Sequence, residues 1–102
     1  MEKEIAGFRV NLSKDGYLTD FSQWNKDIGH AIAAEEGVNL EQHHWKVIDY
    51  IHEQHKNEVP LTIRKVGKSG VVNIKEFYAL FPGGPLKKAS RIAGIPKPVS
   101  CI

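Results

Sequence analysis

Residues 40–56 read LEQHHWKVIDYIHEQHK and carry the clearest helical pattern in the chain. Apolar side chains recur there at spacings of three and four residues, which places them on one face of a helix. Pro60 follows closely and prevents the helix from continuing. The sequence therefore predicts an amphipathic helix over residues 40–56. The side chains that outline its face are Leu40, Trp45, Val47, Ile48, Tyr50 and Ile51.

Two elements are expected before this helix. Gly37 ends a preceding helix, for which Ser22 is a suitable N-cap. Further back, apolar alternation within residues 5–12 and turn residues at 13–16 predict a hairpin whose return strand is residues 17–19. An isolated hairpin is only marginally stable, so it should pack on the helices. The preceding helix carries Trp24, Ile28, Ile32 and Ala33 at helical spacing.

Three shorter helices are expected after Pro60. The first is suggested by Leu61, Ile63, Arg64 and Val66 and ends near residues 67–70, and Asn73 is a suitable cap for the second. The third runs from about Leu86 to Ala93 and ends at Gly94. The predicted fold class is thus mostly α: a small domain of about five helices with an N-terminal β-hairpin and a flexible C-terminal arm. The predicted division is a helical domain over residues 1–94 and a mobile arm over residues 95–102.

The composition is that of an ordinary globular domain. The chain has 102 residues, of which 41% are apolar and 25% charged, with a net charge of +2. Such a chain can bury a modest core without disulfides or a structural metal. A single cysteine favours a reducing compartment, and neither a membrane-spanning run nor an apolar signal segment is present. We expect a cytoplasmic protein with no membrane partner.

The only cysteine, Cys101, stands second from the end of the chain. Pro96 and Pro98 bias the preceding residues toward an extended form, and eight extended residues reach roughly 25 Å. Such a thiol could enter the cleft of another protein, or it could be an incidental terminal residue. A thiolate there would need a nearby cation because the terminal carboxylate is close. The candidates for thiolate contact or docking are Arg64, Arg91 and Lys97.

The five histidines do not form a metal-binding motif. His52 and His55 stand three residues apart on the long helix, with His43 and His44 about two turns earlier. A zinc site needs three or four ligands, and no acidic or cysteine partner has the characteristic spacing. A solvated or interface-forming histidine face is the preferred interpretation, and we expect no metal and no cofactor.

Basic residues are concentrated in the C-terminal half of the chain, whereas acidic residues are concentrated earlier. Short helices with a hairpin could form a winged helix-turn-helix whose basic half contacts phosphate. A solvated face, or a patch that meets an acidic partner protein, explains the same charges. Direct nucleic-acid binding is therefore an alternative hypothesis. It predicts salt-dependent binding that is indifferent to Cys101.

The C-terminal sequence resembles the DsrC/TusE family of sulfur-relay proteins. The resemblance is carried by LFPGGP at residues 80–85, ASRIAGIPKP at residues 89–98 and the penultimate Cys101. Further matches are DGYL at residues 15–18 and His44-Trp45 at the start of the long helix. The resemblance covers essentially the whole chain.

This resemblance implies a sulfur carrier. In the family the penultimate cysteine receives sulfur as a persulfide and delivers it to a partner protein. Members that serve dissimilatory sulfite reductase have a second cysteine eleven residues earlier, where this chain has Ser90. The pattern therefore resembles the single-cysteine, TusE-like branch, which passes sulfur toward 2-thiouridine in tRNA. The implied partners are sulfur-donor and sulfur-acceptor proteins; a role with sulfite reductase or in sulfur regulation is the alternative. Arg64 follows Pro60 as a family arginine near the arm does.

Overall fold

The computed structural model describes residues 1–96. These residues form five α-helices, a short 3-10 helix and a two-stranded antiparallel sheet, which confirms the predicted fold class. Residues 97–102, which include Lys97 and Cys101, lie outside the described part, so the division into domain and arm stays a prediction. The elements are β1 (Glu2–Ile5), β2 (Phe8–Asn11), η1 (Phe21–Gln23), α1 (Lys26–Glu35), α2 (Gln42–Lys56), α3 (Ile63–Gly67), α4 (Ile74–Leu80) and α5 (Pro85–Ala93).

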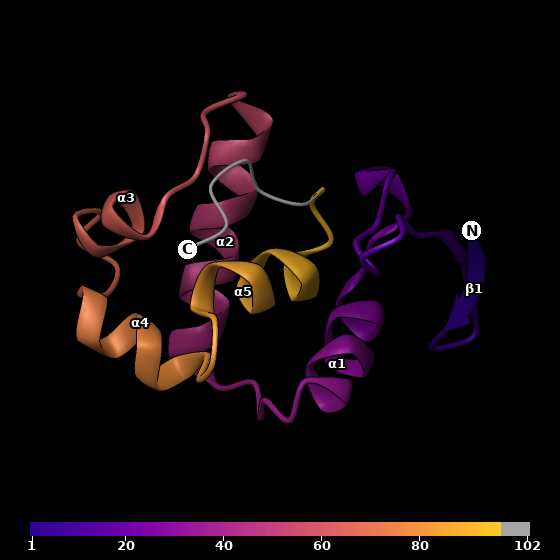
Figure 1. Cartoon of the computed structure of the whole chain (residues 1–102), viewed down its shortest axis with the longest axis horizontal. Coiled ribbons are helices and arrows are strands. Elements are labelled where there is room, and N and C mark those ends of the chain that lie inside the picture. Colours follow the sequence, from indigo (N-terminus) through magenta and orange to yellow (C-terminus); the bar gives the residue numbers. More distant parts are fainter. Residues whose placement is uncertain (97–102) are drawn as a thin grey trace.

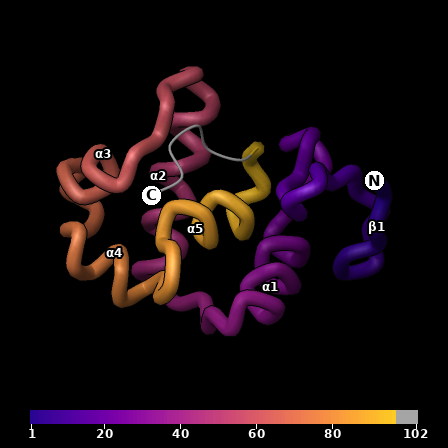
Figure 2. The backbone as a smooth tube through the Cα atoms, viewed as in Figure 1, coloured from indigo at the N-terminus to yellow at the C-terminus, as the bar shows by residue number. Residues whose placement is uncertain are grey.

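Helix α5 lies at the centre of the molecule and packs against both α1 and α2 (Figure 1). The backbone trace shows the β-hairpin beyond α1 at one end and α3 with α4 at the other (Figure 2). Leu86, Ala89 and Ile92 of α5 are fully buried. Burial of one Leu or Ile side chain contributes about 1.5–3 kcal/mol to folding. Helix α5 therefore joins α1 and α2 in the core and fixes where the C-terminal segment begins.

The N-terminal hairpin is present, but its turn lies earlier in the chain than predicted. Strands β1 and β2 pair with Ile5 opposite Phe8, so the chain reverses at Ala6 and Gly7. Both turn residues have positive φ, 53° and 84°, as the tight turn of a two-residue hairpin requires. The predicted turn at residues 13–16 does reverse the chain, but it leads only to a single bridge between Leu12 and Leu18.

The predicted start of the first helix was also wrong. Helix α1 begins after Asn25, whose side chain accepts a hydrogen bond of 2.9 Å from the Ile28 N–H. Ser22 instead lies in η1, where Asp20 is the cap residue. An asparagine oxygen that reaches the N3 amide satisfies a donor that the helix leaves unpaired. Trp24 consequently stands outside the helix, with its indole directed toward α5.

The remaining helices confirm the local signals of the sequence. Asn73 caps α4 in a reciprocal arrangement with Glu76, and α5 ends at Gly94 with φ of 76°. Helix α2 begins at Gln42, two residues later than predicted, because Glu41 and His44 form its capping box. No helix within residues 1–96 is long and apolar enough to span a bilayer.

Candidate functional site

The candidate site is the place where the chain leaves α5 toward Cys101. Ile95 is only 4% exposed and packs in the hydrophobic core, whereas Pro96 is exposed. Cys101 and Lys97 themselves lie outside the described residues. The structure therefore shows the base on which the predicted arm is mounted.

Backbone and side-chain groups together cap the C-terminal end of α5. The Gly94 N–H donates to the Arg91 carbonyl and the Ile95 N–H to the Ser90 carbonyl, each at 3.2 Å. These bonds form because Gly94 adopts the left-handed conformation, which a residue without Cβ takes without strain. They leave the carbonyls of Ile92 and Ala93 to be satisfied by other partners.

Two aromatic side chains bind those carbonyls. The Trp24 indole Nε1–H donates to the Ile92 oxygen at 2.8 Å, and His52 Nε2 lies 2.8 Å from the Ala93 oxygen. A carbonyl only accepts, so Nε2 of His52 carries the hydrogen. The two rings meet edge to face with centroids 4.6 Å apart. We call Trp24 and His52 the arm-root clamp.

The arm-root clamp was not found from the sequence. Trp24 was assigned to a helix face, and His52 to a solvated or interface-forming face. The bonds join residues 68 and 41 positions apart, so no local pattern reports them. The histidine interpretation was wrong for His52 and also for His44, which is buried and binds the Leu80 carbonyl. Within residues 1–96, no three potential ligands among His, Cys, Asp and Glu converge as a metal site.

Burial lowers the pKa of His52 below 6.5, against a smaller opposing effect of its bond to Ala93. Asp49 raises the pKa and His55 lowers it. Below pH 6.5 the unfolded chain therefore binds more protons at this residue than the folded chain does. The contribution of His52 to the free energy of unfolding is full above pH 6.5 and is lost as the pH falls through the lowered folded-state pKa.

We expect His52→Gln to flatten this part of the pH dependence. Glutamine keeps a donor for the Ala93 carbonyl and does not titrate. Urea unfolding of both proteins between about pH 7.5 and about pH 5 would measure the difference. Equal slopes for the two proteins would contradict the assignment. His43→Gln, an exposed position on the same helix, is the control.

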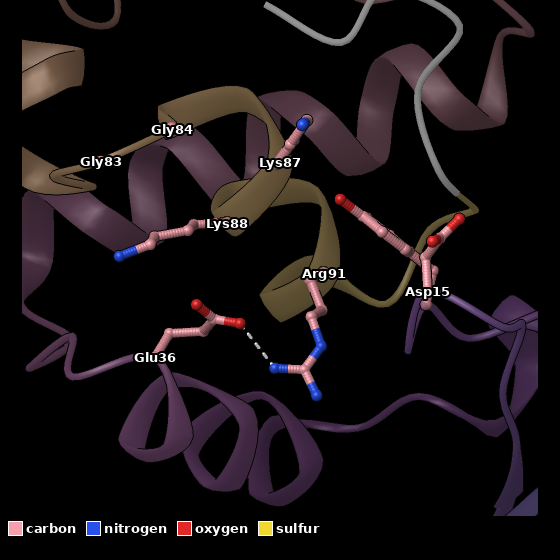
Figure 3. Close-up of a pocket in the computed structure, with 8 residues that line it drawn as sticks. Asp15, Glu36, Gly83, Gly84, Lys87, Lys88 and Arg91 are labelled. Atoms are coloured by element: carbon pink, nitrogen blue, oxygen red, sulfur yellow. Dashed lines mark hydrogen bonds and ion pairs between the residues drawn. The ribbon is translucent and has the colours of Figure 1, made fainter.

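Arg91 is engaged in a polar network (Figure 3). Its Nη1 lies 2.6 Å from Glu36, its Nη2 lies 3.7 Å from Glu35, and its Nε donates to the Gly16 carbonyl at 3.0 Å. The Arg91 side chain is 16% exposed. This network joins α5 to the end of α1 and to the turn before Tyr17. Among the described residues, Glu35 and Glu36 therefore largely balance the charge of Arg91.

Arg91→Met should lower the free energy of unfolding by about 2 kcal/mol, because it leaves Glu36 and a carbonyl without their partner. Arg9→Met is the matched control. Arg9 pairs with Glu2 only at 4.0 Å, and the Arg9 side chain is 77% exposed. That exposed pair should contribute less than about 1 kcal/mol. Urea unfolding measures both, and equal losses would argue against a special role for the Arg91 network.

A pocket of about 290 Å³ adjoins this network. In Figure 3, Lys87 and Lys88 project from α5 beside it, and the Gly83-Gly84 turn forms one rim. Arg64, the other predicted arginine, is exposed on α3, which packs against α4. The structure thus places Arg64 and Arg91 in different parts of the fold (Figure 1) and does not bring them together.

Ser90 is fully buried in α5, and its hydroxyl has no hydrogen-bond partner among the described residues. A buried hydroxyl without a partner is destabilising. Ser90→Ala should therefore raise the free energy of unfolding by about 1 kcal/mol. Ser69→Ala is the control, because the Ser69 hydroxyl donates to Val66 at 2.6 Å and its loss should cost about 1 kcal/mol. A destabilised Ser90→Ala variant in urea unfolding would contradict this prediction.

Comparison with known proteins identifies the family of this chain and agrees with its fold. The family model described as DsrC like protein matches residues 4–102. Sulfurtransferase TusE of Salmonella typhimurium is 36% identical, and the sulfurtransferase TusE homolog of Haemophilus influenzae is 38% identical. Each comparison covers 96% of this chain and 97% of the relative.

A solved structure agrees with this result. The oxidised γ-subunit of dissimilatory sulfite reductase (DsrC) from Archaeoglobus fulgidus matches with a TM-score of 0.82 and 33% identity, and both chains are covered completely. The chain therefore belongs to the DsrC-like family, which confirms the resemblance stated from the sequence. Sulfur transfer is the activity that the curated relatives' names give.

Proposed function

We propose that this protein is a cytoplasmic sulfur carrier whose working atom is the Cys101 sulfur. The observation that carries the proposal is the match to the DsrC-like family over residues 4–102, a range that includes the only cysteine of the sequence, Cys101. The sulfurtransferase relatives support sulfur as the cargo. We propose more specifically that the carried sulfur is held as a persulfide on Cys101.

The transfer step needs no metal and no net oxidation. The Cys101 thiolate attacks the outer sulfur of a donor persulfide, and a new sulfur–sulfur bond forms at Cys101. The donor's own sulfur–sulfur bond breaks, and the donor cysteine leaves as a thiolate. The proton of the transferred sulfur travels with it. Delivery to the acceptor repeats the same exchange with the carrier as donor.

A cation near the thiolate would favour its charged form. Lys97 is proposed for this role because of its place four residues from Cys101. Arg64 is proposed as a docking contact because it is exposed on α3. Arg91 is the weaker candidate, since Glu35, Glu36 and the Gly16 carbonyl already engage its guanidinium.

We propose sulfur delivery toward 2-thiouridine of tRNA as the main role, through partner proteins rather than by direct nucleic-acid binding. Ser90 supports this choice, because a chain with one cysteine cannot form an internal disulfide or trisulfide. A partnership with sulfite reductase is the second candidate, and the likeness to the Archaeoglobus fulgidus γ-subunit favours it. Pull-down with Cys101 trapped as a mixed disulfide would distinguish the two sets of partners.

The direct test is the intact mass of the protein after incubation with a persulfide donor. A gain of one sulfur atom, reversed by a reductant and mapped to Cys101, would support the proposal. No gain from several competent donors would contradict it. Salt-dependent association with DNA that is unchanged by Cys101→Ser would then favour the nucleic-acid hypothesis.

A further inference from the structure

We propose that Trp24 and His52 are positioning residues for sulfur transfer, because the arm-root clamp sets the direction in which the chain leaves α5 toward Cys101. The inference rests on the proposed function, since the direction matters only if Cys101 must meet a sulfur on another protein. Neither residue touches the reacting atoms in this proposal. Each acts through the backbone at the end of α5.

The clamp draws three separate parts of the chain to one point. Trp24 lies between η1 and α1, His52 is on α2, and the carbonyls that they bind belong to the last turn of α5. Both bonds are 2.8 Å long. The end of α5 is therefore held by side chains from two other segments of the chain.

Neighbouring rings fix the orientation of each clamp side chain. Phe21 stacks on Trp24 with an angle of 14° between the ring planes and a centroid distance of 6.2 Å. The same Phe21 ring lies 5.0 Å from that of His52. Gly94 allows the indole to lie directly against the backbone, because a Cβ at that position would collide with Trp24. The indole can therefore neither rotate nor withdraw without breaking other contacts.

These bonds are additional to the backbone bonds that end the helix. The N–H groups of Gly94 and Ile95 already close α5 in the usual backbone manner. The carbonyls at an exposed helix end are commonly satisfied by water. Here the last turn of α5 is buried, so two half-buried side chains take the place of that water, and Ile95 is anchored in the core immediately afterwards. The added contacts define an orientation that capping alone does not.

The clamp fixes the point from which the chain continues toward Cys101. Six residues, the number from 97 to 102, can span at most about 20 Å, so the place where the chain leaves α5 limits the region that Cys101 can reach. Reacting atoms must approach to about 3–3.5 Å, and a misplacement of about 1 Å can reduce a rate a hundredfold. A fixed root therefore shortens the search that Cys101 must make in a partner's cleft.

The test uses the single native cysteine as a reporter. One nitroxide label is placed on Cys101 and a second on Lys75→Cys, an exposed position of α4. Pulsed electron paramagnetic resonance then gives the distribution of distances between the labels. Trp24→Phe, which removes the indole donor, and His52→Leu should both broaden or shift this distribution. His52→Gln, which keeps a donor, should restore it.

Trp45→Phe is the matched control, since Trp45 contacts His30 and Lys26 rather than the end of α5. That variant should leave the distribution unchanged. Near-ultraviolet circular dichroism verifies that each variant is folded. A distribution that is the same in Trp24→Phe, in His52→Leu and in the otherwise unaltered doubly labelled protein would overturn the proposal. So would equal broadening by Trp45→Phe. Failure of unlabelled protein to accept sulfur would contradict the proposed function without changing this distance measurement.

Discussion

Cys101→Ser should abolish the acceptance of sulfur from a persulfide donor while leaving the fold intact. A serine hydroxyl does not form a persulfide, and the chain has no other cysteine that could substitute. Among the described residues, the last member of the hydrophobic core is Ile95. Intact mass spectrometry measures the loss, and an unchanged urea midpoint shows that stability is not its cause.

An accessible thiol of any origin can react with small polysulfides, so the sharper comparison uses a protein donor. Ser100→Cys combined with Cys101→Ser moves the thiol by one residue and keeps its chemistry. If the native position has evolved to meet a partner, the displaced thiol should be loaded about tenfold more slowly by a protein whose cysteine carries a persulfide. Equal rates for the two thiols would identify Cys101 as an incidental reactive residue and would remove the main support for a carrier.

The parts of the fold that could be predicted are those encoded locally. The periodicity of residues 40–56, the Asn73 cap and the Gly94 stop each act within one or two turns of a helix, and each was confirmed. The position of the hairpin turn could not be predicted because alanine, the residue at position 6, is not typical of such turns. Its φ in the structure is nevertheless positive. A tight turn with alanine forms where the strand pairing on either side holds it.

The candidate site likewise has one part that the sequence displays and another that only the folded structure brings together. The chemistry of Cys101 follows from a residue type and its place in the chain, which a sequence displays directly. The arm-root clamp depends instead on a tryptophan and a histidine that meet the end of α5 only after the chain has folded. Arg91 illustrates the same limit. Its charge was visible in the sequence, but its partners Glu35 and Glu36 lie more than fifty residues away.

Gly94→Ala should cause the largest loss of stability among single methyl additions at the glycines of positive φ. A residue with Cβ in the left-handed conformation costs about 1–2 kcal/mol. The new methyl group would also collide with Cδ1 and Cγ of Trp24, so the indole would have to move away from the Ile92 carbonyl. Losing that bond costs about a further 1–3 kcal/mol. We expect the free energy of unfolding to fall by about 3 kcal/mol in urea titration.

Gly37→Ala separates the cost of the left-handed backbone conformation from the cost of the collision with Trp24. Gly37 has φ of 72°, close to the 76° of Gly94, but no atom lies within 4 Å of a Cβ built there. It should therefore show the backbone cost alone, about 1 kcal/mol. Adding Trp24→Phe to Gly94→Ala provides the second separation, because the hydrogen bond is then already lost. The two changes together should cost less than the sum of their separate effects, since they share one contact. Strict additivity would mean that Gly94 is needed only for its backbone conformation and not for the approach of Trp24.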